Sequence, residues 1–171
     1  MSEMLVGVIP HVLMATGRIQ SRGYTLIVTN IRLIFARLGA PQMQEAMAQS
    51  KARAKSFLEK MAAGRVLTSK DIVEYCRRYF SMTPDSILGE SPDNFVIQLE
   101  GITRIYVDHQ VEPKDDDSSI QMDRYVMTIV SPLGENEYVF DADPQDMGVL
   151  RHVLGERVHG DGRAKPIRPS F

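Results

Sequence analysis

Few side chains in this 171-residue chain have the type and spacing that a catalytic or metal-binding site needs. The single cysteine, Cys76, falls on the apolar stripe of an expected helix, and no sequence feature marks a base that would activate it. Free cysteines in such positions behave as small core residues, so we interpret Cys76 in that way. The four histidines lie on different expected elements and suggest no shared site: His11, His109, His152 and His159.

The acidic run around His109 could bind a cation. Asp108, His109 and Glu112 precede three consecutive aspartates at 115–117, which would offer clustered oxygen ligands on a loop. These acids do not follow the spacing of a known calcium loop. We therefore interpret the run as a solvated hairpin tip, and predict no metal site and no cofactor.

The motifs of several large enzyme families are absent from the sequence. It has no Gly-x-Gly-x-x-Gly after a strand, no phosphate loop ending in Gly-Lys-Ser/Thr, and no His-Glu-x-x-His, Gly-x-Ser-x-Gly or Cys-x-x-Cys. We predict no catalytic residue and expect a protein that is not an enzyme. A pocket for a small ligand or a reaction stays open as an alternative, because folds are readily reused.

Basic residues are concentrated in the first part of the chain. Residues 1–66 contain nine lysines and arginines against three acids, whereas residues 67–171 contain eleven against nineteen. A basic patch would attract phosphates, but the two parts could equally mix in space and cancel. The pI near 6.1 and the lack of a recognised RNA or DNA motif argue against nucleic acid binding.

The elements that must position these residues begin with a β-rich segment. The run from Gly23 to Phe35 is rich in β-branched and aromatic residues, and Thr29-Asn30 supplies turn chemistry in its middle. We expect a meander of strands around Pro10 and this turn. The expected strands cover residues 5–9, 12–19, 24–28 and 32–38.

The apolar period then changes from that of a strand to that of a helix. A helix is expected from Pro41 through Met61, with Gly64 as its stop. Its large apolar residues are candidates for an interface with a partner or a second copy, and a plain helix-on-sheet core explains the same stripe. These candidate interface residues are Met43, Met47, Phe57 and Met61.

A second helix is expected from Thr68, because Asp71 follows three residues later as a capping-box partner. A short helix starting at Thr83-Pro84 completes a helical block at about residues 40–90. The apolar stripe expected on the second helix comprises Ile72, Tyr75, Cys76, Tyr79 and Phe80.

Strands resume after Ser91-Pro92 and are followed by one helix. That helix is expected over residues 143–158, and residues 160–171 are expected to form a flexible tail. The strands are expected at residues 95–99, 102–108, 120–130 and 137–141, with a polar loop at 114–119. The apolar stripe of the last helix comprises Met147, Leu150, Leu154 and Val158.

These runs resemble prokaryotic PH-like and GRAM-like domains. The resemblance is carried by the strand-turn-strand run Gly23–Phe35, the run Phe95–Ile105 and the strand-to-helix step Tyr138–Asp143. It implies an α+β fold in which a strongly bent antiparallel β-barrel or sandwich is closed by a C-terminal capping helix. Residues 1–159 would then form a single domain, with the helical block inserted between the third and fourth strands. The insertion and the absence of tryptophan depart from a classical PH domain.

The resemblance also implies a binding module. In PH domains the first hairpin turn often carries basic residues that meet lipid phosphates, and Arg18 and Arg22 flank that turn here. The insertion adds further basic residues that could join such a surface. The candidates for contact with anionic lipid are therefore Arg18, Arg22, Lys51, Arg53 and Lys55.

We therefore expect a non-catalytic interaction module that docks a protein partner or a second copy through an edge strand or the insertion. Peripheral binding of anionic membrane lipids is the alternative. The sequence has no apolar run near the roughly 18 residues of a membrane helix, and no basic n-region at its start. One cysteine suits a reducing compartment, so the expected location is cytoplasmic, or peripheral at the membrane for the alternative.

Overall fold

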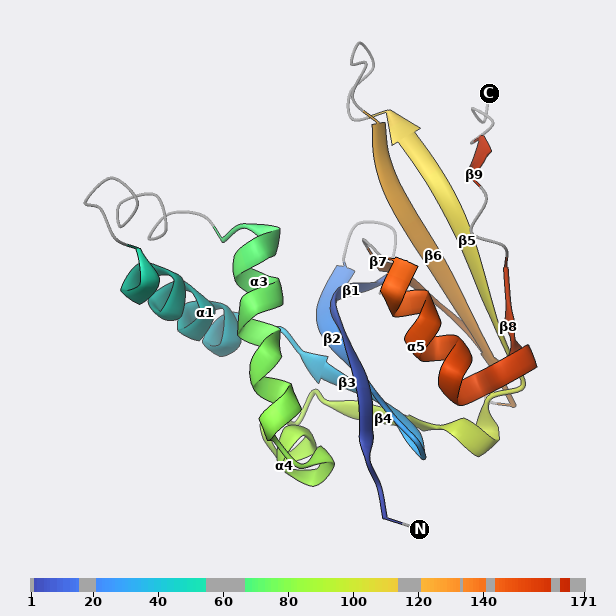
Figure 1. Cartoon of the computed structure of the whole chain (residues 1–171), viewed down its shortest axis with the longest axis horizontal. Coiled ribbons are helices and arrows are strands. Elements are labelled where there is room, and N and C mark those ends of the chain that lie inside the picture. The colour runs from blue at the N-terminus through green and yellow to red at the C-terminus, as the bar shows by residue number, and fades with distance from the viewer. Residues whose placement is uncertain are drawn as a thin grey trace.

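The strands of the protein make one open mixed sheet, accompanied by helices in an α+β fold (Figure 1). The computed structural model describes residues 2–15, 21–54, 67–113, 121–132, 134–140, 144–160 and 164–166. The strand order is β4-β3-β2-β1-β7-β6-β5-β8, and β9 also pairs with β5. Since β4 and β8 stand at opposite ends of this order, the sheet is not closed. The α+β class is confirmed, and of the two expected alternatives, a barrel or a sandwich, the structure does not show a closed barrel.

The first half of the sheet is the expected antiparallel meander. One continuous strand stands where two were expected around Pro10, and its register with β2 shifts between Ile9 and Val12. Pro10 has no N–H to donate and His11 has a φ of 57°, so a bulge accommodates both residues without ending the strand. The four strands are β1 (Leu5–Ala15), β2 (Ser21–Thr29), β3 (Arg32–Arg37) and β4 (Phe95–Gln98).

The turn between β2 and β3 is organised by Thr29, as the sequence predicts. Its Oγ1 accepts hydrogen bonds from the backbone N–H groups of Ile31 at 3.2 Å and Arg32 at 2.9 Å. Asn30 exchanges hydrogen bonds with the N-terminal segment, because its N–H donates to the Met4 carbonyl and its side chain accepts from the Met4 N–H. The turn therefore also fixes the start of the chain.

The second half of the sheet continues from the first through β7, which pairs with β1. Strands β5, β6 and β7 are antiparallel, whereas the C-terminal strands β8 and β9 run parallel to β5. The expectation of a purely antiparallel sheet is therefore wrong. The strands are β5 (Arg104–Pro113), β6 (Gln121–Ser131), β7 (Gly134–Phe140), β8 (Val158–His159) and β9 (Ala164–Pro166).

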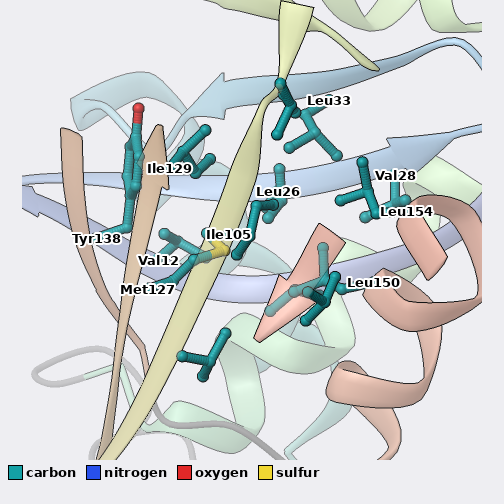
Figure 2. Close-up of a cluster of buried hydrophobic side chains, with 14 of the residues drawn as sticks. Val12, Leu26, Val28, Leu33, Ile105, Met127, Ile129, Tyr138, Leu150 and Leu154 are labelled. Atoms are coloured by element: carbon teal, nitrogen blue, oxygen red, sulfur yellow. The ribbon is translucent and has the colours of Figure 1, made fainter. Parts of the chain in front are cut away.

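The main core lies between the two halves of the bent sheet, under the C-terminal helix α5 (Pro144–Leu154). The Phe35 ring stacks on the rings of both Phe95 and Tyr138, with centroids 4.6 and 4.7 Å apart. Figure 2 shows side chains of β1–β3, of β5–β7 and of α5 gathered in this cluster: Val12, Leu26, Val28, Leu33, Ile105, Met127, Ile129, Tyr138, Leu150 and Leu154.

The helical insertion stands between β3 and β4, as expected. Its first helix ends at Arg53, and Ala54 is extended with a ψ of 127°, so the single helix expected through Met61 is interrupted there. Residues 55–66, which include the expected stop at Gly64, lie outside the described residues. The insertion elements are α1 (Ala40–Arg53), α3 (Ser69–Cys76), the 3₁₀ helix η1 (Arg77–Ser81) and α4 (Pro84–Gly89).

A second apolar cluster forms where the insertion covers the other face of β2 and β3. Ile27, Ile34 and Ala36 from these strands pack with side chains of α1, α3, η1 and α4. Alternate residues of the same strands, such as Leu26 and Phe35, point into the main core. Burial on both faces explains why this strand pair is a near-continuous apolar run in the sequence.

The C-terminal helix is shorter than the sequence predicts. The helix α5 ends at Leu154, a 3₁₀ turn η3 (Gly155–Arg157) follows, and Val158 is buried as part of β8. The side chain of Met147 and the polar loop at 114–119 lie outside the described parts. In the segment expected to be a tail, Ala164–Pro166 forms β9 beside β5, and the flexibility of the segment stays a prediction.

Candidate interaction surface

The helix α3 starts with the capping box that the sequence predicts. The Asp71 N–H donates to Thr68 Oγ1 at 3.3 Å, and the Thr68 N–H donates to Asp71 Oδ2 at 3.0 Å. The hydrogen bond from the Thr68 hydroxyl is the largest cause that lowers the pKa of Asp71, and one from Ser50 adds to it. The capping residues thus define where the helix begins and how it meets α1.

The end of α3 overturns one expectation of the sequence. Ile72, Tyr75, Cys76 and Tyr79 are buried as expected, but Phe80 is 61% exposed. After Cys76 the helix tightens to the 3₁₀ form, which turns by about 120° per residue instead of about 100°. Over four residues the extra rotation is about 80°, enough to move Phe80 from the edge of the buried stripe to the solvent side.

The solvent side of α3 and η1 therefore presents an apolar row. Val73 is 43% exposed and Phe80 is 61% exposed, and the side chain of Arg77 between them is 69% exposed. Their spacing of four and three residues places them on one helical face. We name Val73, Arg77 and Phe80 the α3 surface. Sequence reasoning missed it because periodicity alone does not signal a change of helix type.

A half-buried arginine holds η1, the base of the α3 surface, in place. The Arg78 guanidinium lies over the rings of Tyr75 and Tyr79, 4.4 and 4.9 Å from their centroids. It also pairs with Glu45 of α1 at 3.3 Å and with Glu90 after α4 at 2.8 Å. One side chain thus joins α1, α3, η1 and the end of α4. The surface is therefore carried on a rigid base.

The phenols around Arg78 are held protonated. The Tyr75 hydroxyl donates to Glu45 Oε2 at 2.9 Å, and burial followed by this hydrogen bond raises the Tyr75 pKa far above its ordinary value. Burial also raises the pKa of Tyr79 to about 12. At neutral pH the Tyr75 hydroxyl is a neutral donor to Glu45, and the Tyr79 hydroxyl is neutral and accepts from the Arg78 guanidinium at 3.4 Å.

A second arginine, Arg32, ties the insertion to the start of the chain. Its guanidinium makes a two-point pair with Glu3, at 2.8 Å for each contact, and a third contact with Asp85 at 2.7 Å. Its partners come from the N-terminal segment and from α4, rather than from a neighbouring strand.

The basic residues proposed for lipid contact are only partly described. Arg22 is exposed at the start of β2, and Lys51 and Arg53 are exposed in the last turn of α1. The Arg53 guanidinium lies 3.6 Å from Glu74. Figure 1 shows the end of α1 well away from the start of β2, so these residues do not gather in one patch. Arg18 and Lys55 lie outside the described residues.

The methionine candidates for an interface are also partly described. Met43 is half-buried and packs against the cluster between the insertion and the sheet. Met47 is half-buried on the same helix. Phe57 and Met61 lie outside the described residues. An interface role for these four side chains stays a prediction.

The surroundings of Cys76 do not favour a reactive thiol. Its side chain is buried, and its Sγ lies 3.0 Å from Thr25 Oγ1. Burial raises the thiol pKa to about 11, so the thiolate is scarce at neutral pH. Within the described ranges, no group of three or more His, Cys, Asp or Glu side chains could hold a metal ion. The acids at 115–117 lie outside them.

Comparisons of this chain with known proteins found one similar solved structure. No family model matches this chain, and no curated protein matches it. One solved structure, the C-terminal domain of an unknown protein from Leishmania infantum, is 9% identical with a TM-score of 0.42. That match covers 89% of this chain and 84% of the other. None of the helices among the described residues is long and apolar enough to cross a membrane.

Proposed function

We propose that this chain is a non-catalytic, PH-like interaction module that binds a protein, either a partner or a second copy, through the α3 surface. The observation that carries the proposal is the exposure of Phe80, 61% of whose surface faces solvent on an element that Arg78 holds rigidly. A large aromatic residue beside an arginine on a fixed base is typical of the residues that dominate protein interfaces.

The strand order supports the PH-like part of the proposal. Seven antiparallel strands form two halves that pack face to face, and the C-terminal helix α5 contributes Leu150 and Leu154 to the core between them. The helical insertion is the element that this plan does not require. A function specific to this chain is therefore expected on the insertion, where the α3 surface lies.

The contribution of Phe80 to the binding free energy can be worked out from its exposed area. A phenylalanine side chain buries on the order of 150–250 Å², of which about 60% is still available here. At about 25 cal/mol per Å², its burial contributes roughly 2–4 kcal/mol. That corresponds to an affinity roughly 30- to 700-fold weaker after its removal. The neighbouring Arg77 pairs with Glu74 at 3.2 Å, so the proposal rests on the apolar side chains of this surface rather than on an unmatched charge.

The test compares variants of the α3 surface with a matched control. Phe80→Ser and Val73→Ser remove the apolar row, and Met4→Ser removes an apolar side chain that is 59% exposed elsewhere. Sedimentation velocity measures self-association, and retention of a protein from extract of the source cells measures partner binding. We expect Phe80→Ser and Val73→Ser to lose the association and Met4→Ser to keep it.

Two results would contradict the proposal. One is an association that Phe80→Ser leaves unchanged, and the other is a wild-type chain that neither self-associates nor retains a protein. Co-sedimentation with neutral and anionic liposomes at low and physiological salt tests the lipid alternative in parallel. Salt-sensitive binding to anionic liposomes alone would favour the alternative, with Arg22 and Lys51 as its first variants.

A further inference from the structure

The outer edge of β5 is covered by the C-terminal segment of the same chain. Val158 and His159 pair with Ile105 and Tyr106, and Ala164–Pro166 pairs with His109–Val111, all in parallel. The edge of a strand accepts any extended segment that can supply N–H and C=O groups. Two short strands therefore occupy an edge that is ten residues long.

The first of these strands, β8, is firmly held. Val158 is only 8% exposed and belongs to the main core. The Arg151 guanidinium donates to the Gly160 carbonyl at 2.7 Å. Gly160 has a φ of 131°, and a Cβ there would collide with the Val107 carbonyl oxygen, so its backbone packs directly on β5. The chain is anchored as far as Gly160.

The second strand, β9, is held by much less. It has three residue pairs with β5, and Pro166 at its end has no N–H to donate. A strand of only three residue pairs that ends at a proline opens at low free-energy cost.

The charges of the C-terminal segment and of β5 favour pairing of this segment with the β5 edge of a second copy. Asp108 and Glu112 flank the β5 residues that pair with β9, and Arg104 lies at the other end of β5. The segment after Gly160 contains three basic residues against one acid. The basic residues are Arg163, Lys165 and Arg168. An extended segment of this composition is attracted to an edge of the opposite sign.

We propose that β9 is a releasable strand and that the β5 edge beneath it takes the same segment from a second copy, giving a strand-exchanged dimer. Each pairing between copies replaces an identical pairing within a copy, so the exchange costs mainly association entropy. Figure 1 shows β9 and β5 on the other side of the molecule from α3. The exchange is thus independent of the α3 surface.

The test traps the exchange with cysteines placed in register. Gln110 and Lys165 are paired residues of β5 and β9. A full-length chain with Gln110→Cys is mixed with a second full-length chain with Lys165→Cys, under oxidised glutathione at high protein concentration. A disulfide between the two chains then requires β9 of one copy to lie on β5 of the other. The natural Cys76 is buried and does not compete.

Two controls make the outcome decisive. In the first, Gln110→Cys is mixed with Lys70→Cys, whose residue is exposed on α3, and reports random collision. In the second, one chain carries both Gln110→Cys and Lys165→Cys and is expected to close an internal disulfide. We expect the exchange pair to form a heterodimer at least about tenfold faster than the collision pair, because paired strands hold the thiols within bonding distance.

Each remaining outcome overturns the proposal. If the exchange pair reacts no faster than the collision pair while the double variant closes internally, β9 stays on its own copy. If the double variant forms no disulfide between the cysteines placed at positions 110 and 165, either within a chain or between chains, the β5–β9 register is wrong and the edge is not the site.

Discussion

A methyl group added at Gly7 tests how α5 seats on the sheet. Gly7 lies on β1 beneath α5, and a Cβ at this position would stand 2.5 and 2.8 Å from the two methyl carbons of Val149. Ordinary carbon contacts begin at about 3.5 Å. Gly7→Ala therefore forces α5 or β1 to move, or forces Val149 out of its rotamer.

The expected cost follows from two opposing terms. Overpacking a well-filled core costs about 1–3 kcal/mol. Replacing glycine stiffens the unfolded chain and returns about 0.4–1 kcal/mol. The net loss in the free energy of unfolding is therefore about 1–2 kcal/mol, or a fall in Tm of about 2–8 °C for a domain of this size.

Urea unfolding of three alanine variants measures this difference. Gly89→Ala and Gly101→Ala are the matched controls, because a Cβ at either position would meet nothing within 4 Å. We expect these two variants to be neutral or slightly stabilised, and Gly7→Ala to be destabilised.

A second substitution separates the contact with Val149 from other effects at Gly7. Val149→Ala removes both methyl groups that the new Cβ would meet. The double variant should therefore be more stable than the sum of the single losses predicts. The reasoning is refuted if Gly7→Ala unfolds like the wild type, or if the two losses simply add.

Four further predictions concern the insertion, the buried titratable groups and the surface. Thr68→Ala should lose about 0.5–2 kcal/mol in urea unfolding, and Thr68→Ser should not, because only the hydroxyl caps α3. Burial raises the pKa of Cys76 from 9.0 to about 11 and that of Tyr79 from 10.0 to about 12. The unfolded chain thus releases these protons first, so these two groups leave Tm unchanged from neutral pH to pH 9 and lower it between pH 9 and 12, less steeply in Tyr79→Phe. Arg78→Met should lower stability by about 1–3 kcal/mol, because it leaves the half-buried carboxylate of Glu90 without its partner. A Tm equal to that of the wild type would show that Arg78 is not a structural link. Arg22→Glu should leave Tm unchanged, since the residue is exposed, and a large fall would show that it packs.

Local signals in the sequence predict much of the fold because they act over a few residues. The hydroxyl of Thr29 closes the β2–β3 turn and the Thr68–Asp71 pair caps α3, and neither depends on distant contacts. Pro10 misled the strand assignment, because a bulge within a long paired strand absorbs a residue that would end an isolated one. The parallel pairing of β8 and β9 has no local signature at all.

The candidate site was harder to predict than the fold. The sequence predicts Phe80 in the buried stripe because an ideal helical period places it on the same face as Cys76, four residues earlier. That period carries no signal for the change to a 3₁₀ helix at Arg77. The basic residues were grouped by their nearness in the sequence. In the structure the start of β2, which carries Arg22, lies well away from the last turn of α1, and Arg53 pairs with Glu74 at 3.6 Å.

The two-sided burial of β2 and β3 makes the insertion inseparable from the domain. Trimming the chain to a bare strand-and-helix unit would leave Ile27, Ile34 and Ala36 facing water beside one another. Such a patch would invite aggregation. Any shortened version, and any descendant of this chain that lost the helices, would have to replace those three side chains at the same time. The helical insertion thus covers one face of β2 and β3 as the main core covers the other. Substitutions on one face of these strands are therefore constrained by the packing on the opposite face.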